Sequence, residues 1–162
     1  MKIFSMAILA TFLFMTNVAS AEVEINRKEL IQRALDVQKN AYAPYSNFKV
    51  AAAVLCSSGK IYTGVNVENS DYTAVISAIR NVISHAVTEG EHQICAVATV
   101  AVANGVNTDY CPPGGTCRQV MREFANPKKL LIIMAKSPTD YIEKTLEELL
   151  PMSFGPDNLQ RK

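Results

Sequence analysis

The sequence predicts one domain of the α/β class, with a single mixed sheet and helices on both of its faces. Two observations lead to this prediction. The first is the order of the periodic segments, which alternate between helical and strand spacing as helix, β-hairpin, helix, strand, helix, strand and helix. The second is size, because 162 residues without an internal repeat suit one domain with a substantial core.

The first part of the domain is predicted to be a helix followed by a β-hairpin. Residues 26–29, Asn-Arg-Lys-Glu, resemble a capping box, and apolar residues continue at helical spacing until Pro44, so the helix should run to about residue 42. Two runs rich in β-branched and apolar residues follow, at 48–55 and 61–67. The turn residues 57–60 between them join the two runs into a hairpin.

The second part alternates helices and strands. Residues 75–87 place a broad apolar face at helical spacing, which ends at Glu89-Gly90. Residues 94–103 form a long run of alanine and valine, which is typical of a strand buried on both faces. The remaining segments are a helix at 117–124, a strand at 130–135 and a last helix at 142–150 that Pro151 closes.

The N-terminus has the pattern of a cleaved signal peptide. Lys2 precedes a nearly uncharged apolar run at 3–15, and the small residues Ala19-Ser20-Ala21 stand before Glu22. The alternatives, a buried first helix or a membrane anchor, are weaker because roughly 18 apolar residues are needed to span a bilayer. We therefore expect residues 1–21 to be removed and the mature domain, residues 22–162, to be secreted or periplasmic.

The charge of the mature chain argues against nucleic-acid binding. Removing residues 1–21 takes Lys2 and no acidic residue, so 16 basic and 15 acidic groups become 15 of each. A chain without net positive charge or a basic patch lacks the electrostatic footprint that nucleic acids require.

Four cysteines remain after cleavage: Cys56, Cys95, Cys111 and Cys117. In an oxidising compartment such residues can form disulfides, and four cysteines allow three pairings. A bridge between Cys111 and Cys117 is one hypothesis. For Cys56 and Cys95, a role as small buried apolar side chains is equally consistent with the sequence.

Two short motifs point to a family. They are Ser77-Ala78-Ile79-Arg80 and the segment 113–119, Pro-Gly-Gly-Thr-Cys-Arg-Gln, and the longer segments 41–50 and 149–156 accompany them. Together they resemble the small homotetrameric cytidine deaminases, which are zinc enzymes and read C-A-E-R and P-C-G-A-C-R-Q in the short motifs. The resemblance implies a three-layer αβα cytidine deaminase-like fold with a five-stranded mixed sheet, and a homotetramer.

The resemblance also assigns a pyrimidine nucleoside as the ligand. Phe48 matches a residue beside the base, Asn66 and Glu68 match residues on the ribose hydroxyls, and Phe154 matches one that reaches into a neighbouring subunit's site. The alternative is that these are a core phenylalanine, two strand-end polar residues and a surface hydrophobe. One departure is Ala51, where the family commonly has glycine, and its methyl group could crowd the floor of the site.

The catalytic positions depart from the family further. Ser77 and Gly114 occupy two of the three zinc-ligand positions, Ile79 occupies the position of the catalytic glutamate, and only Cys117 is retained. Catalytic zinc normally takes three protein ligands, and the hydrolysis also needs a carboxylate that carries protons. Loss of the metal returns water from a pKa of about 7 to about 15.7, and loss of general acid–base catalysis costs about 10² to 10⁴ more.

Other residues offer little replacement. His85 lies eight residues after Ser77 on the same predicted helix, about 12 Å along its axis, whereas a zinc bond is about 2 Å long. His92 is expected to face solvent, and Cys111 is the one serious substitute ligand. Arg80 matches an arginine that offsets thiolate charge in the family, so here it needs another acceptor or must turn outward.

Three interpretations follow. The preferred one is an exported, catalytically inactive homologue without zinc that still binds a pyrimidine nucleoside. The second is an active cytidine or deoxycytidine deaminase with an atypical zinc site around Cys111 and Cys117. The third is a structural or interaction module in which the old pocket has collapsed. The topology implied by the resemblance also makes Cys56 and Cys95 neighbours on antiparallel strands, where a second disulfide would stabilise the fold by about 2–4 kcal/mol.

Overall fold

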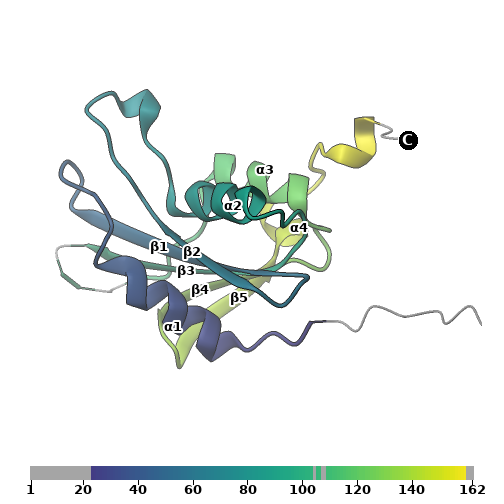
Figure 1. Ribbon diagram of the computed structural model, residues 1–162, viewed down its shortest axis with the longest axis horizontal. Helices are drawn as coiled ribbons and strands as arrows, with labels where there is room; N and C mark the ends of the chain where they lie inside the picture. Colours follow the sequence, from purple (N-terminus) through teal and green to yellow (C-terminus); the bar gives the residue numbers. More distant parts are fainter. Residues whose placement is uncertain (1–22, 104, 107–108, 160–162) are drawn as a thin grey trace, which may run out of the picture.

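The computed structural model describes residues 23–103, 105–106 and 109–159. Within these residues the chain forms a three-layer sandwich of helices and one mixed sheet (Figure 1). The expected three-layer αβα architecture is confirmed. The predicted signal peptide, residues 1–21, lies outside the described residues. Among the helices of the described part, none is long and apolar enough to cross a membrane.

The sheet has the strand order β2-β1-β3-β4-β5. The strands are β1 (Phe48–Cys56), β2 (Ile61–Val65), β3 (Ile94–Ala103), β4 (Leu131–Ser137) and β5 (Asp140–Thr145). The pairs β1/β2, β1/β3 and β4/β5 are antiparallel, whereas β3/β4 is parallel. The sheet is therefore mixed, and β3 lies at its centre as its unbroken apolar sequence predicts.

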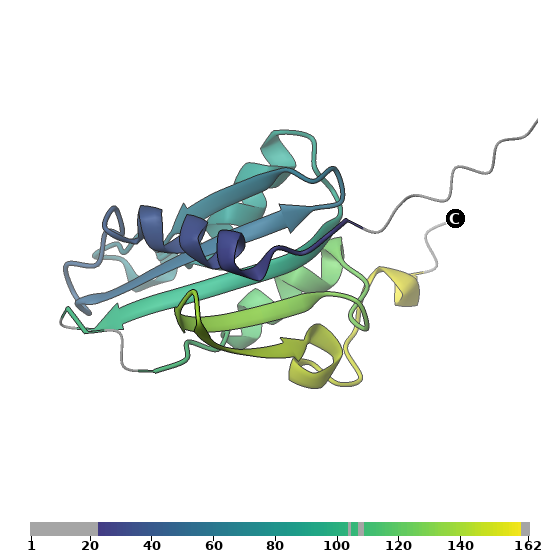
Figure 2. The same ribbon diagram turned by 90° about the horizontal axis from the view of Figure 1, so that it is seen from below.

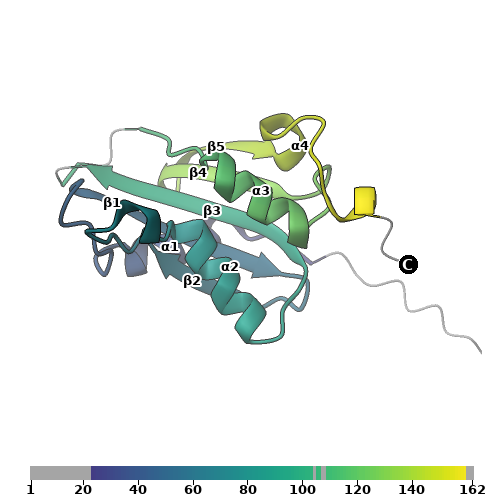
Figure 3. The same ribbon diagram turned by 90° about the horizontal axis from the view of Figure 1, so that it is seen from above.

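The helices cover both faces of the sheet. Helix α1 (Arg27–Gln38) lies on one face of the sheet (Figure 2). Its residues Leu30, Ile31 and Ala34 are buried against β1 and β3. Helices α2 (Ala78–Thr88) and α3 (Gly115–Phe124) lie side by side on the other face (Figure 3). Shorter elements complete the fold: the 3₁₀ helices η1 (Tyr72–Ala74) and η2 (Pro156–Leu159), and α4 (Leu146–Leu149).

The prediction for the C-terminal part was wrong in one respect. The segment expected to form one helix at 142–150 is instead the edge strand β5 followed by the single-turn helix α4. Its glutamates, lysine and leucines have good helix propensity, but pairing with β4 overrides that preference. Exposed and half-buried side chains alternate along β5, as expected of an edge strand that packs one face against the protein and turns the other to solvent. Thr145 then caps α4 in a capping box with Glu148.

Gly64 sets how closely α2 approaches the sheet. A Cβ atom on this β2 residue would lie 2.7 Å from the backbone nitrogen of Val82 on α2, a separation that real Cβ atoms do not show. The absence of a side chain therefore lets the helix backbone pack directly on the strand. This close packing fixes the position of the N-terminus of α2, where the first family motif begins.

Candidate functional site

The N-terminus of α2 is held by Ser77. This residue is extended, with φ −73° and ψ 153°, and its hydroxyl oxygen accepts a hydrogen bond from the backbone N–H of Arg80 at 3.4 Å. The sequence predicted that the two residues before it belong to the helix. They lie outside it, because Ile76 pairs with Val67 in an antiparallel bridge. Serine is a favoured N-cap, so Ser77 has a purely structural use at this position.

The N-terminus of α3 is open. Gly114 is the N-cap residue and provides no side-chain hydrogen bond, and a Cβ atom on Gly114 or Gly115 would meet no heavy atom within 4 Å. The loop before it is fixed instead by Arg118, whose Nε donates to the Pro113 carbonyl at 2.7 Å. Room for a side chain therefore exists at position 114, but the chain places none there.

Cys117 joins the two helix termini. It lies in the first turn of α3 and is 8% exposed, and its Sγ is 3.1 Å from the Ser77 Oγ. Two of the positions that the resemblance assigns to zinc ligands are thus adjacent in space. They contact each other directly through a side-chain hydrogen bond.

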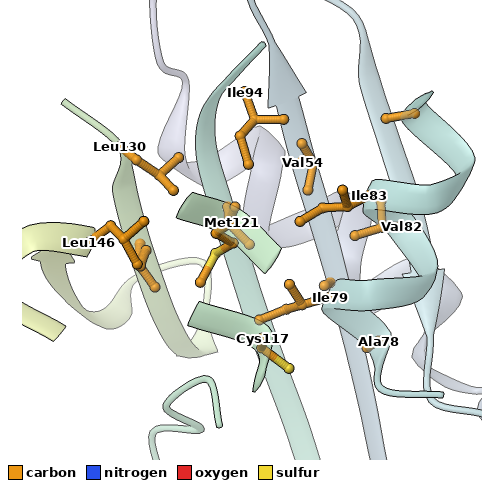
Figure 4. Close-up of a cluster of buried hydrophobic side chains, with 14 of the residues drawn as sticks. Val54, Ala78, Ile79, Val82, Ile83, Ile94, Cys117, Met121, Leu130 and Leu146 are labelled. Carbon is orange, nitrogen blue, oxygen red and sulfur yellow. The ribbon is translucent and has the colours of Figure 1, made fainter. Parts of the chain in front are cut away.

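Ile79 lies in the core. Its side chain is 3% exposed and extends from α2 toward Cys117 and Met121 of α3 (Figure 4). All three residues belong to one buried apolar cluster between the sheet and the helices. The position that carries the glutamate in the family is therefore apolar and dry, an environment that disfavours a charged group.

Cys111 approaches the same region from the loop before α3. Its carbonyl accepts a hydrogen bond from the Thr99 hydroxyl at 2.9 Å, and its side chain is partly buried. Burial raises the pKa of the Cys111 thiol, and the neighbouring Cys117 raises it further. Both residues are free thiols. The hypothesis of a bridge between them is not met in the structure, where the Cys117 sulfur contacts Ser77 instead.

The second hypothetical bridge, between Cys56 and Cys95, is also absent, since both residues are free thiols. The strands that carry them are antiparallel neighbours, as the resemblance implies. A register shift between Leu55 and Cys56, however, pairs Cys56 with Ile94, so Cys95 is displaced from the position opposite Cys56. Burial raises the pKa of the Cys56 thiol to about 11.

Three basic residues stay outside this centre. Arg80 is exposed and donates to the Val75 carbonyl at 3.5 Å, so it has both turned outward and found another acceptor. His85 is exposed and its ring contacts Tyr62 edge-on, with the ring centroids 5.2 Å apart. His92 is exposed at the start of β3. Neither histidine contacts Ser77 or Cys117.

Asn66 lies at the end of β2 and is 8% exposed. Its Oδ1 accepts from the backbone N–H of Val50 at 2.8 Å, and its Nδ2 donates to the Phe48 carbonyl at 2.9 Å. The amide thus continues the pairing between β1 and the chain beyond β2. Phe48, which begins β1, is 40% exposed beside this contact.

Glu68 supports a turn of the chain before β1. Its carboxylate accepts hydrogen bonds from the backbone N–H groups of Tyr45 and Ser46, at 2.9 and 3.2 Å, and from the Ser46 hydroxyl. The Ser46 hydroxyl and these two N–H groups hold the pKa of the carboxyl below its usual value. A shallow pocket of about 180 Å³ lies here, lined by Tyr45, Ser46, Glu68, Tyr72 and Val75.

The C-terminal segment that carries Phe154 is fastened to α3, a feature that the sequence analysis did not identify. Gln119 donates to the Phe154 carbonyl at 3.0 Å, and the largely buried Arg122 binds Asp157 at 2.7 Å. The Phe154 side chain itself is 61% exposed. The polar residues Gln119 and Arg122 on α3 were the signal for this contact that the sequence offered. Only the fold shows what they bind.

Ala51 does not lie at the site. Its side chain is buried in the cluster beneath α1, on the face of the sheet opposite α2 and α3. Neighbouring residues of a strand point to opposite faces, and Ala52 is the one that faces α2. The expectation that the Ala51 methyl group crowds the pocket floor is therefore wrong.

The donor set around the helix termini does not fit a catalytic zinc. The metal takes nitrogen, thiolate and carboxylate ligands, and the positions in question carry one thiol, one hydroxyl and one glycine. Within the described residues, no group of three or more histidine, cysteine, aspartate or glutamate side chains is placed to hold a metal ion. Cys111 would bring the number of sulfur donors to two.

Comparison with known proteins assigns the family. A family model for the cytidine and deoxycytidylate deaminase zinc-binding region matches residues 24–134. The chain belongs to the cytidine deaminase family. The curated cytidine deaminase of Halalkalibacterium halodurans is 35% identical over 135 residues, which cover 83% of this chain and 98% of the relative. A probable cytidine deaminase of Dictyostelium discoideum is 36% identical over 141 residues, covering 85% and 92%.

Solved structures agree with this family and fold. Cytidine deaminase from Burkholderia pseudomallei matches with a TM-score of 0.72 and 34% identity, covering 80% of this chain and 100% of that one. Cytidine deaminase from Mycobacterium tuberculosis matches with a TM-score of 0.70 and 32% identity, covering 82% and 99%. The region matched by the family model contains Ser77, Ile79, Gly114 and Cys117. This member of the cytidine deaminase family thus keeps the scaffold around an altered centre.

Proposed function

We propose that this chain is an exported, catalytically inactive member of the cytidine deaminase family, whose remaining role is binding. The observation that carries the proposal is Ile79, which is buried in apolar surroundings at the position that the resemblance assigns to the proton-carrying glutamate. A buried aliphatic group can neither accept nor donate a proton. Within the described residues, no carboxylate contacts Ser77 or Cys117 to take its place.

The second requirement is an activated water, and the chain's own groups do not meet it. The hydroxyl of Ser77 and the thiol of Cys117 hydrogen-bond to each other, and Gly114 offers no side chain. Unactivated water leaves the reaction slower by roughly eight to nine orders of magnitude in available hydroxide at neutral pH. The loss of general acid–base catalysis lowers the rate by about 10² to 10⁴ more.

The test is an activity assay with metal analysis on one sample of residues 22–162. We expect no uridine or deoxyuridine from cytidine or deoxycytidine by chromatography, and no stoichiometric zinc by elemental analysis. The cytidine deaminase of Halalkalibacterium halodurans, assayed in parallel, is the positive control. One tightly bound zinc per chain together with steady formation of uridine would contradict the proposal.

A second candidate is an active deaminase with an atypical site around Cys111 and Cys117. The activity named for the relatives favours it, and so does the proximity of the two thiols. Under this candidate the variants Cys111→Ser and Cys117→Ser each lose both zinc and activity. Under the inactive reading, neither variant changes an activity that is already absent.

Whether the binding role includes a nucleoside depends on the region around Asn66 and Glu68. The Asn66 amide is largely buried and bonded to backbone groups, and the pocket beside Glu68 is about 180 Å³, below the roughly 300 Å³ typical of ligand sites. Contacts to a nucleoside would therefore come mainly from Phe48, Glu68 and Phe154 of a second copy of the chain. Calorimetric titration with cytidine and uridine tests this: saturable heat supports a nucleoside ligand, and no heat supports an interaction module.

Export and self-association are part of the same proposal. The signal-like pattern at residues 1–21 supports cleavage after Ala21, and the exposed Phe154 side chain supports assembly of several copies. N-terminal sequencing of protein recovered from the source cells should begin at Glu22. Light scattering should give a mass near four chains.

A further inference from the structure

The contact between Ser77 and Cys117 connects the N-termini of two helices that are far apart in the sequence. The separation of 3.1 Å between Oγ and Sγ is a hydrogen-bond distance for sulfur, and either atom can be the donor. The Ser77 oxygen already accepts from the Arg80 N–H. Its hydrogen is therefore available to donate to the Cys117 sulfur, so one hydroxyl caps α2 and binds α3.

Apolar packing closes the same junction from below. Ile79, two residues after Ser77, is buried in the cluster that contains Cys117 and Met121. Figure 4 shows that its side chain fills the space between α2 and α3 beside the cysteine. The junction consequently has a polar contact at its rim and a packed aliphatic interior, and each is made by side chains of the chain itself.

We propose that this Ser77–Cys117 hydrogen bond and the packing of Ile79 replace a metal ion as the connection between α2 and α3. The family model describes a zinc-binding region, and a metal held between two helices contributes to folding that is lost with chelators. Here the hydroxyl of Ser77 and the sulfur of Cys117 join the two helix termini directly. The inference goes beyond the proposed function, because it concerns how the fold is held and applies whether or not a nucleoside binds.

The first experiment is denaturant unfolding of residues 22–162 with and without a strong chelator, and with added zinc. The expected result is the same transition midpoint in all three conditions. A chelator that lowers the midpoint, or stoichiometric zinc that raises it, would show a metal connection and overturn the inference.

The second experiment is a double-mutant cycle of Ser77→Ala and Cys117→Ala. Each single variant should have a larger unfolding equilibrium constant than the wild type. The double variant should raise this constant by less than the product of the two single effects, and the difference, which is the coupling, should be about five-fold. The cycle is needed because Ser77→Ala also removes the N-cap hydrogen bond from the Arg80 N–H. That loss is the same with and without Cys117, so it cancels in the cycle. Multiplicative effects, without coupling, would contradict the inference.

A matched control uses another helix cap. Thr145 caps α4 through the backbone N–H of Glu148 and does not contact Cys117. Thr145→Ala combined with Cys117→Ala should show no coupling. Equal coupling in both cycles would mean that the Ser77 result reflects general loss of stability and would count against a specific bond.

A third experiment tests directly whether positions 77 and 117 are adjacent, and it needs no comparison of stabilities. The variant Ser77→Cys, combined with Cys111→Ser to remove the neighbouring thiol, is treated with diamide as the oxidant. Two thiols at this separation should lose their hydrogens to diamide and form one disulfide between positions 77 and 117, identified by peptide mapping. Failure to cross-link would contradict the arrangement. Deamination of cytidine by the wild type would contradict the proposed function but not this inference.

Discussion

The two halves of the candidate site differ in how far they match the family pattern, and they also differ in what their side chains contact. At the helix termini, Ser77, Ile79 and Gly114 replace the groups expected in the family, and the remaining side chains belong to the core. At the end of β2, Asn66 and Glu68 are both present. Each of these two side chains has hydrogen bonds to the backbone of the segment before or within β1. The half that matches the family pattern is therefore the half whose side chains also hold the backbone.

The largest expected effect tests the apolar half. Ile79→Glu should destabilise the fold by about 3–5 kcal/mol, because the carboxylate would be buried among apolar side chains without a partner. The free energy of unfolding from denaturant titration measures this. Ile79→Val is the matched control and should cost about 1 kcal/mol. If Ile79→Glu were as stable as the wild type, a solvated cavity would remain at this position and the contrast between the halves would fail.

The next effect tests whether Asn66 holds the fold. Asn66→Ala should cost about 1–2 kcal/mol, because it removes a buried amide and leaves the partly buried Val50 N–H and the Phe48 carbonyl without their side-chain partners. The same substitution at the exposed Asn40 should change stability by no more than about 0.5 kcal/mol. Equal effects at the two positions would mean that Asn66 is retained for a reason other than the fold.

A smaller effect concerns Glu68 and depends on pH. Its pKa is lowered in the folded chain by the Ser46 hydroxyl and by the N–H groups of Tyr45 and Ser46, so its stabilisation is present above the ordinary carboxyl pKa. The stabilisation is lost as the pH falls through the lowered value. Glu68→Gln should therefore be less stable than the wild type at neutral pH, and the difference should narrow in acid.

Ser46→Ala sharpens the Glu68 prediction. This variant removes the first cause of the lowered pKa while leaving the two backbone donors in place. The pH dependence of its unfolding midpoint should be weaker than that of the wild type. A gap between wild type and Glu68→Gln that is constant with pH would show that the carboxylate charge has no part in holding the turn.

The smallest effect is expected at Gly114. A methyl group there meets no heavy atom within 4 Å, and its φ of −64° suits any residue, so Gly114→Ala should change stability by no more than about 0.5 kcal/mol. Gly64→Ala is the contrasting control, because its Cβ would lie 2.7 Å from the Val82 backbone nitrogen. A large loss of stability in Gly114→Ala would mean that the fold requires glycine at this position.

Most of the architecture could be predicted from the sequence because it depends on local periodicity. The central strand β3 was predicted with its observed bounds, 94–103, since both of its faces are apolar. The segment 142–150 was not, because the pairing partner that makes it a strand is β4, and that preference has no local signal. The start of α2 was placed three residues early, at residue 75 instead of Ala78, for a similar reason, since Ile76 pairs with Val67.

The sequence by itself determined the class of fold and, through its motifs, the family, and it places a serine, an isoleucine and a glycine at positions 77, 79 and 114. The tertiary structure decided what these residues contact: the hydroxyl of Ser77 binds Cys117, and Ile79 packs into the core. It also gave Asn66 and Glu68 their backbone partners. These facts depend on contacts between segments separated by 16 to 40 residues, which residue identity cannot specify until the sheet and helices bring them together.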